Sequence, residues 1–243
     1  MLSSLLFGAL LHLQTGMTTT CDIPAGQLTA TYAVSQQHAG HPGQTATLVL
    51  WRNGNQVAHQ HPQTGITESW THVKQRWIKP VRYFDDDERA IEYMPGERIH
   101  GKADTDWSLR YQLISDALLS QMTLVDETGE GCERTQQFSL NTATGAIHLT
   151  WQPALRLVRS FEQVQGENRQ TWTLTSITQD NEAITQFFRH RDGYYSTDFA
   201  DIGDDHTDPF LIRMVNQGFI QPGASGFYTA DGTPLAGTHD HAH

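Results

Sequence analysis

The sequence predicts a mainly β (α+β) protein with one large, curved antiparallel sheet of about ten strands in sequential hairpins, covered by two helices. Three observations support this fold class. Short β-rich runs follow one another from Gln27 to Phe199, with turn residues between them. Asn53-Gly54 is a dipeptide favoured in type I′ hairpin turns. Two segments, 106–122 and 209–217, have apolar residues at helical spacing.

The clearest hairpin covers residues 45–61, where two β-rich runs are joined by Asn53-Gly54. A two-residue turn at this dipeptide fixes the register of the hairpin. The expected register places three pairs on one side of the ribbon: Leu50 opposite Val57, Leu48 opposite His59, and Ala46 opposite His61.

Further hairpins are expected in the second half of the chain. Residues 155–164 and 169–178 are two β-rich runs separated by a short polar turn. Residues 183–190 and 194–199 flank Asp192-Gly193, another favoured turn pair, and are expected to form the last hairpin.

The first helix is expected over 106–122, with Asp106 available as its N-cap. One apolar stripe runs along it, formed by Trp107, Tyr111, Ile114, Leu118 and Met122. The second helix is expected over 209–217. Asp208 has N-cap chemistry, Pro209 suits the first helical position, and Gly218 is placed to end the helix.

Elements that pair in sequence order need only short connections, which favours a topology of successive hairpins. A strongly twisted, half-rolled sheet with helices over its concave face is the architecture that follows. By analogy, it resembles the half-barrels of exported lipoprotein carriers, the LolA/LolB-like proteins. The resemblance is one of architecture and implies a binding protein.

Residues 21–236 are expected to form a single β-rich domain, because no linker or change of composition divides them. Residues 1–20 contain the apolar run 5–13, which has the length of a signal-peptide core and is too short to span a bilayer. This favours a periplasmic or secreted protein. A start at Met17 would remove the run and leave a cytoplasmic one.

The chain has two cysteines, Cys21 and Cys132. Two distant cysteines in an exported protein fit a single disulfide, since oxidising compartments preserve such bonds. Two buried reduced thiols are the alternative.

The formal net charge is -11. This charge argues against nucleic acid or an anionic membrane surface as a partner. An apolar small molecule or a partner protein is the expected partner, and no integral membrane span is expected.

A groove for such a ligand is expected where aromatic side chains meet the helix-covered face of the sheet. Tryptophan often lines apolar pockets that have one polar contact. The proposed lining residues are Trp70, Trp77, Trp107, Tyr111 and Trp172. The alternative is an ordinary aromatic core.

Histidine spacing suggests a second kind of site. His59 and His61 project from one face of a strand, and imidazole nitrogen is a good ligand for Zn²⁺ or Cu²⁺. The tail at 237–243 adds His239, His241 and His243, a short histidine-rich tract. Ordinary surface histidines are the alternative for both groups.

The acidic segment before the second helix suggests a Ca²⁺ site, because Ca²⁺ collects carboxylate oxygens from flexible loops. Asp201, Asp204 and Asp205 are its candidate ligands. Helix capping and Asx-turns account for the same residues without a metal.

Enzyme motifs are missing from the sequence: it has no G-x-S-x-G elbow, no phosphate-binding loop and no H-E-x-x-H. We therefore expect an exported, non-enzymatic binding protein that takes a lipid, an acyl chain or a partner protein in a groove of the sheet. A periplasmic metal-binding protein is the second hypothesis, and a hydrolase with a dispersed site is the third.

Overall fold

The computed structural model describes residues 22–99, 102–202 and 207–216. The longer strands are β1 (Gln27–Gln37), β2 (Gln44–Asn53), β3 (Gln56–His61), β4 (Ile66–Val73), β5 (Trp77–Phe84), β6 (Arg89–Glu92), β9 (Thr123–Thr128), β10 (Thr135–Thr142), β11 (Gly145–Gln152), β12 (Leu157–Gln165), β13 (Asn168–Thr178) and β14 (Tyr195–Asp198). A separate small pair is formed by β7 (Arg98–Ile99) and β8 (Lys102–Ala103).

The helices are short. The α-helices are α1 (Trp107–Gln112), α2 (Asp116–Gln121), α3 (Asn181–Asp192) and α4 (Pro209–Asn216). Single 3₁₀ turns are η1 (Asp85–Asp87), η2 (Gly131–Glu133) and η3 (Phe199–Asp201).

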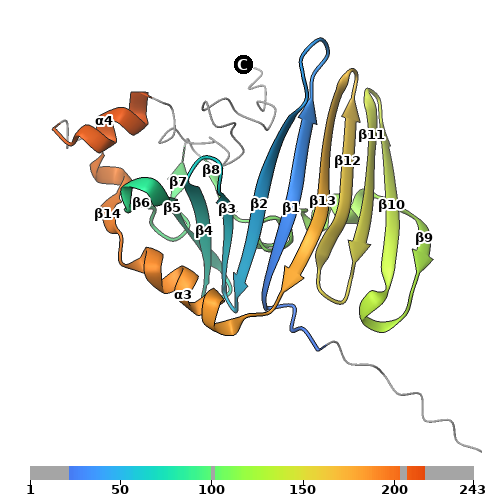
Figure 1. Cartoon of the computed structure of the whole chain (residues 1–243), viewed down its shortest axis with the longest axis horizontal. Helices are drawn as coiled ribbons and strands as arrows, with labels where there is room; N and C mark the ends of the chain where they lie inside the picture. Colours follow the sequence, from blue (N-terminus) through green and yellow to red (C-terminus); the bar gives the residue numbers. More distant parts are fainter. Residues whose placement is uncertain (1–21, 100–101, 203–206, 217–243) are drawn as a thin grey trace, which may run out of the picture.

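One open 12-stranded sheet dominates the fold, in the order β14-β6-β5-β4-β3-β2-β1-β13-β12-β11-β10-β9. Figure 1 shows these strands side by side, with β14 at the left edge and β9 at the right edge. The predicted class, a large antiparallel sheet, is confirmed. Two runs of sequential strands, β1 to β6 and β9 to β13, are joined by the pairing of β1 with β13, and β14 joins β6 in parallel.

The Asn-Gly hairpin forms, but its predicted register is wrong: the turn lies one residue further along the chain, so each residue of β2 pairs with a residue two positions later in β3. Asn53 pairs with Gln56, so the loop residues are Gly54 and Asn55. Gly54 has a positive φ of 64°, which suits the first central position of a type II′ turn, where glycine is required. Leu50 therefore faces His59 instead of Val57. The shift moves the pairing by two residues, so His59 and His61 stay on the face of Leu48 and Leu50.

The single helix predicted over 106–122 is two helices, and this prediction is wrong. Asp106 caps α1 as expected, accepting from the backbone N–H of Leu109 at 3.1 Å. Leu113 then adopts the left-handed conformation (φ 67°) and ends α1. Ser115 caps a new helix by accepting from the N–H of Leu118 at 2.9 Å. A serine inside an apolar stripe thus starts a second helix.

Residues 183–190, predicted as a strand, lie in α3, and this prediction is also wrong. Asp180 caps α3 by accepting from the N–H of Ala183 at 2.9 Å. The buried residues follow helical spacing: Ile184, Phe187, Phe188 and Arg191. The described residues therefore form four α-helices where two were expected. α3 covers a face of the sheet, and the ring of Phe187 stacks on that of Trp51 with centroids 3.9 Å apart.

The helix predicted over 209–217 is present as α4, Pro209–Asn216. The Asp208 carboxylate accepts from the N–H of Phe210 at 2.8 Å and from Arg89 at 2.6 Å. Phe210, Leu211 and Met214 pack against β4 to β6 in a small separate core. The predicted cap is confirmed.

The two faces of the sheet have different covers. We call the face of Tyr32, Leu50 and Trp70 the inner face; it contributes most of the main core and is packed against α1 and α2. The opposite, outer face carries Trp51 and Ala58 under α3. The predicted helix-covered groove therefore corresponds to the inner face.

A buried arginine, Arg52, fastens α1 to the inner face. Its guanidinium donates to four backbone carbonyls, those of Ala25, Tyr111, Leu155 and Arg156, at 2.7–3.0 Å. The ring of Tyr111 lies 3.9 Å from its Cζ. Burial lowers the pKa of Arg52 to about 10, which leaves it charged at neutral pH. Sequence reasoning missed this residue because its partners are carbonyls far away in the chain.

Cys132 is disulfide-bonded, which agrees with the first of the two alternatives, and the other cysteine, Cys21, lies outside the described residues. The predicted signal segment 1–20 and the tail 237–243 also lie outside them. Within the described part of the chain, no helix is long and apolar enough to cross a membrane.

Candidate functional site

A continuous row of apolar side chains crosses the inner face. Strand pairing places one residue from each of β2, β1, β13, β12, β11 and β10 in line: Ala46, Val34, Trp172, Phe161, Leu149 and Phe138. We call this set the apolar row. With neighbouring strands about 4.8 Å apart, the row is about 24 Å long.

Burial is uneven along the apolar row. Val34, Leu149 and Phe161 are buried in the main core, whereas Trp172 and Phe138 are only half-buried. Trp172 packs against Phe161, with ring centroids 4.7 Å apart. Half-buried apolar side chains also lie around the row: Leu118, Leu119, Leu140 and Leu174. Part of this apolar surface is therefore in contact with solvent.

On β2, β1, β13 and β12 the next row of the inner face changes from apolar to amide side chains, whereas β11 and β10 continue it with Ile147 and Leu140. Residues two positions along the same strands line up as Gln44, Gln36, Gln170 and Gln163. We call this set the glutamine row. Gln36 is only 7% exposed, and its Oε1 has no hydrogen-bond partner within the described part of the chain. Buried amides normally have partners, so this one marks a place where polar contact is missing.

Three of the five predicted groove residues gather around α1. Trp70 is buried and stands edge-on to His59, Trp107 stacks on His72 with centroids 4.6 Å apart, and Tyr111 lies against Arg52. These rings are packed into the core or onto its margin.

The other two predicted groove residues lie elsewhere. Trp77 is 43% exposed and projects from the outer face, opposite to its buried neighbour Ile78. Trp172 belongs to the apolar row. The five residues therefore do not line one groove, and Trp172 alone lies on the partly exposed part of the inner face.

The predicted metal pair is buried beside an ion pair. His59 Nε2–H donates to the carbonyl of Arg110 at 2.7 Å, and Glu68 pairs with Arg82 at 2.6 Å. Burial lowers the pKa of His59 to about 3 and that of His61 to about 4. Burial alone would raise the pKa of Glu68, but Arg82 and His61 outweigh it and the pKa is lowered. At pH 7 both histidines are therefore neutral, and Glu68 and Arg82 are both ionised.

The described residues do not form a metal-binding cluster. No group of three or more His, Cys, Asp or Glu side chains within the described ranges is arranged to hold a metal ion. Asp201 is exposed in η3. Asp204, Asp205, His239, His241 and His243 lie outside the described residues.

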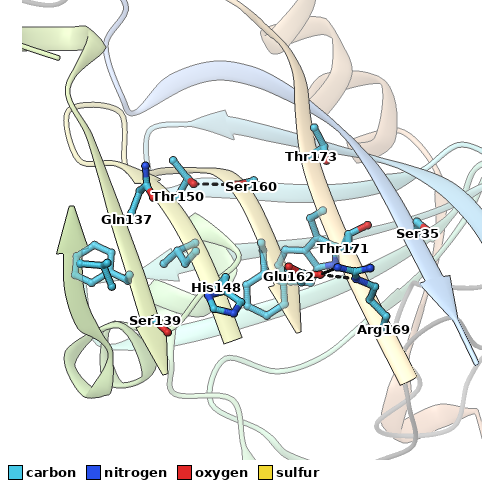
Figure 2. Close-up of a pocket in the computed structure, with 15 residues that line it drawn as sticks. Ser35, Gln137, Ser139, His148, Thr150, Ser160, Glu162, Arg169, Thr171 and Thr173 are labelled. Atoms are coloured by element: carbon cyan, nitrogen blue, oxygen red, sulfur yellow. Dashed lines mark hydrogen bonds and ion pairs between the residues drawn. The ribbon is translucent and has the colours of Figure 1, made fainter. Parts of the chain in front are cut away.

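The outer face carries a shallow pocket of about 620 Å³ on β10 to β13 and β1 (Figure 2). Its labelled side chains are mostly hydroxyls, and the Ser160 hydroxyl donates to that of Thr150 at 2.9 Å. Glu162 forms an ion pair with Arg169 at the same surface. The pocket thus combines hydroxyl and charged side chains with apolar residues, and its lining also includes Val125, Phe138, Leu149, Phe161 and Trp172.

One row of this pocket contains Ser139, His148 and Glu162 on adjacent strands. The order serine, histidine, carboxylate is that of a hydrolytic triad, which requires hydrogen bonds from nucleophile to base and from base to acid. No hydrogen bond joins these three side chains in the described structure, and Glu162 is held by Arg169 instead. The geometry gives no support to nucleophile activation here.

No protein-family model matches the chain, and the comparison with curated proteins gives no match. Similar solved structures include PNGF-II, with 12% sequence identity and a TM-score of 0.38. The match covers 70% of this chain but only 31% of PNGF-II. A second is the Pseudomonas aeruginosa MucA/MucB complex, with 10% identity and a TM-score of 0.32 over 66% of this chain and 56% of that chain. A third is a LolA superfamily protein from Nitrosomonas europaea, with 8% identity and a TM-score of 0.29 over 65% of this chain and 88% of that chain. Values this low say nothing about ligand, activity or partner.

Proposed function

We propose that this protein is an exported, non-enzymatic binding protein that takes an apolar ligand, a lipid or acyl chain, on the inner face of its sheet. The observation that carries the proposal is the apolar row, in which the large side chains Trp172 and Phe138 are only half-buried. Large apolar side chains that stay partly exposed on an otherwise packed face are typical of a binding surface.

A chain-like ligand fits the shape and chemistry of this surface. The apolar row is about 24 Å long on the strand spacing, and it is composed of aliphatic and aromatic side chains. Each methylene group transferred from water to such a surface contributes about 0.8 kcal/mol. A partner protein could satisfy the same chemistry by presenting an acyl chain or an apolar segment.

Export is supported by the state of Cys132, which is disulfide-bonded. Disulfides persist in the periplasm and outside the cell and are rare in reducing compartments. A periplasmic or secreted location is therefore part of the proposal.

The test is to measure binding of dansyl-hexadecylamine, a fluorescent probe with an acyl-like chain, to the purified chain and two tryptophan variants. Trp172→Ala removes the largest half-buried side chain of the apolar row and should weaken binding by about tenfold or more. Trp77→Ala is the matched control, because Trp77 projects from the outer face. Circular dichroism confirms that both variants fold.

Two results would overturn the proposal. The probe would fail to bind the unaltered protein, or Trp77→Ala would weaken binding as much as Trp172→Ala does. The second result would move the ligand to the outer face.

A further inference from the structure

The glutamine row lies directly beside the apolar row, so a ligand on one touches the other. Gln36 follows Val34 by two residues on β1, and Gln170 precedes Trp172 by two residues on β13. Side chains two apart on a strand share a face. A chain lying along the apolar row therefore has its polar end within reach of Gln36 and Gln170.

Gln36 is the member of the glutamine row whose environment points to a ligand. It is 7% exposed, and the buried end of its amide has no hydrogen-bond partner in the residues described. An amide can present either its oxygen or its NH₂ group to a neighbour, so it suits a donor or an acceptor. It has no charge with which to neutralise an ion.

Charged groups near the glutamine row are directed elsewhere. Arg169 adjoins Gln170 in sequence but points to the outer face, where it pairs with Glu162 (Figure 2). His38 is hydrogen-bonded to Asn168 at 2.9 Å. An ionised carboxylate or phosphate at Gln36 would lose its hydration without gaining a counter-charge.

A cation does lie on the opposite side of the apolar row. Arg159 is two residues before Phe161 on β12, and its charge opposes the rise that burial causes in the pKa of Tyr32. An anionic head would be attracted there instead. Arg159 is exposed, so water and salt weaken that attraction.

We propose that the ligand of the inner face has a neutral hydrogen-bonding head, an amide, ester or hydroxyl, held at Gln36, with its acyl chain along the apolar row. This inference rests on the proposed function and narrows its ligand class. The same chemistry is offered by an amide-linked acyl group and by a neutral glycerolipid.

The experiment compares ligands that share one chain and differ only in the head. Palmitoyl ethanolamide, monopalmitoylglycerol and palmitic acid are each titrated against the protein at pH 7.5, with 1-bromohexadecane as the chain without a polar head. We expect at least one neutral-headed ligand to bind about two- to tenfold more tightly than palmitic acid, the range that corresponds to one hydrogen bond. Binding of the amide alone indicates an acylated amine as the source, and binding of the ester alone indicates a glycerolipid.

Two variants localise the effect. Gln36→Leu keeps the size of the side chain and should abolish the preference for neutral heads, while leaving the affinity for 1-bromohexadecane unchanged. Gln44→Leu, at the exposed end of the same row, is the matched control and should keep the preference. Thermal melts show whether each variant is folded.

The failures are distinguishable. If palmitic acid binds most tightly and Arg159→Gln removes that preference, the head is read by Arg159 and the inference is wrong. If 1-bromohexadecane binds and all heads are equivalent, the inference is also wrong while the proposed function stands. If neither 1-bromohexadecane nor any headed ligand binds, the proposed function itself fails.

Discussion

Two halves of the inner face differ in whether their buried polar side chains have hydrogen-bond partners. In the helix-docked half, formed by β2 to β4 and α1, Arg52 has four carbonyl partners and His59 donates to Arg110. In the open half, formed by β10 to β13 with β1, Gln36 has an amide end without a partner in the residues described. The difference indicates that the first half is built to hold its own helix and the second to meet another molecule.

The largest effect is expected from Arg52→Met, which breaks the helix-docked half. Methionine preserves much of the apolar stem but leaves four backbone carbonyls, that of Leu155 buried and the others partly buried, without their donor. Since each unsatisfied buried group costs about 1–3 kcal/mol, we expect a loss of about 5 kcal/mol in the free energy of unfolding. Urea unfolding followed by circular dichroism measures it.

Arg159→Met is the control for that experiment, because Arg159 is exposed. It should change the free energy of unfolding by less than about 0.5 kcal/mol. Equal losses in the two variants would mean that Arg52 does not act through its carbonyl partners.

A pair of tryptophan variants sharpens the same comparison. Trp70 is 4% exposed in the helix-docked half, and Trp70→Ala should cost about 4 kcal/mol, as is usual for a large core side chain. Trp172 is half-buried in the open half, and Trp172→Ala should cost about 1–2 kcal/mol because less surface returns to water. If Trp172→Ala is as costly as Trp70→Ala in urea unfolding, the open half is an ordinary core.

We expect acid to lower the stability of the protein through two buried histidines of the helix-docked half, His59 and His61. The pKa of His59 is about 3 and that of His61 about 4, both below the ordinary value of 6.5, so the unfolded chain binds more protons between these values. Stability therefore falls as the pH decreases below 6.5. At pH 5 the loss is about 2 kcal/mol for each histidine, on the conversion of about 1.4 kcal/mol per pKa unit.

The measurement is urea unfolding at pH 7.5 and at pH 5. His61→Leu removes one of the two groups and should make the stability less sensitive to pH, although it lowers stability at pH 7.5. A pH dependence that is unchanged in His61→Leu would show that this histidine is already protonated in the folded protein at pH 5.

Local features of the fold could be predicted from the sequence, because they depend on neighbouring residues. The caps at Asp106 and Asp208 and the hairpin of β12 with β13 are confirmed. Alternation along 45–61 correctly placed His59 and His61 on the face of Leu48, although the turn was misplaced. Because side chains alternate between the two faces of a strand, a register shift of two residues leaves each side chain on its predicted face.

Long-range features could not be predicted. The pairing of β1 with β13 brings Gln36 beside Gln170, and no local pattern indicates that these residues meet. The apolar row and the glutamine row exist only through this pairing. α3 was missed although Ile184, Phe187 and Phe188 have helical spacing, because Asp192-Gly193 was interpreted as a hairpin turn.

The smallest effect is expected from Ser160→Ala, and it tests which face of the open half binds the ligand. Ser160 lies in the outer pocket and donates to Thr150 at 2.9 Å (Figure 2). An exposed hydrogen bond of this kind contributes less than about 0.5 kcal/mol to stability, since water replaces the partner. Affinity for dansyl-hexadecylamine should be unchanged, because the serine and the apolar row project from opposite faces of β12. A tenfold loss of affinity in this variant would assign the ligand to the hydroxyl-lined pocket, and the half-buried Trp172 would then be part of the core alone.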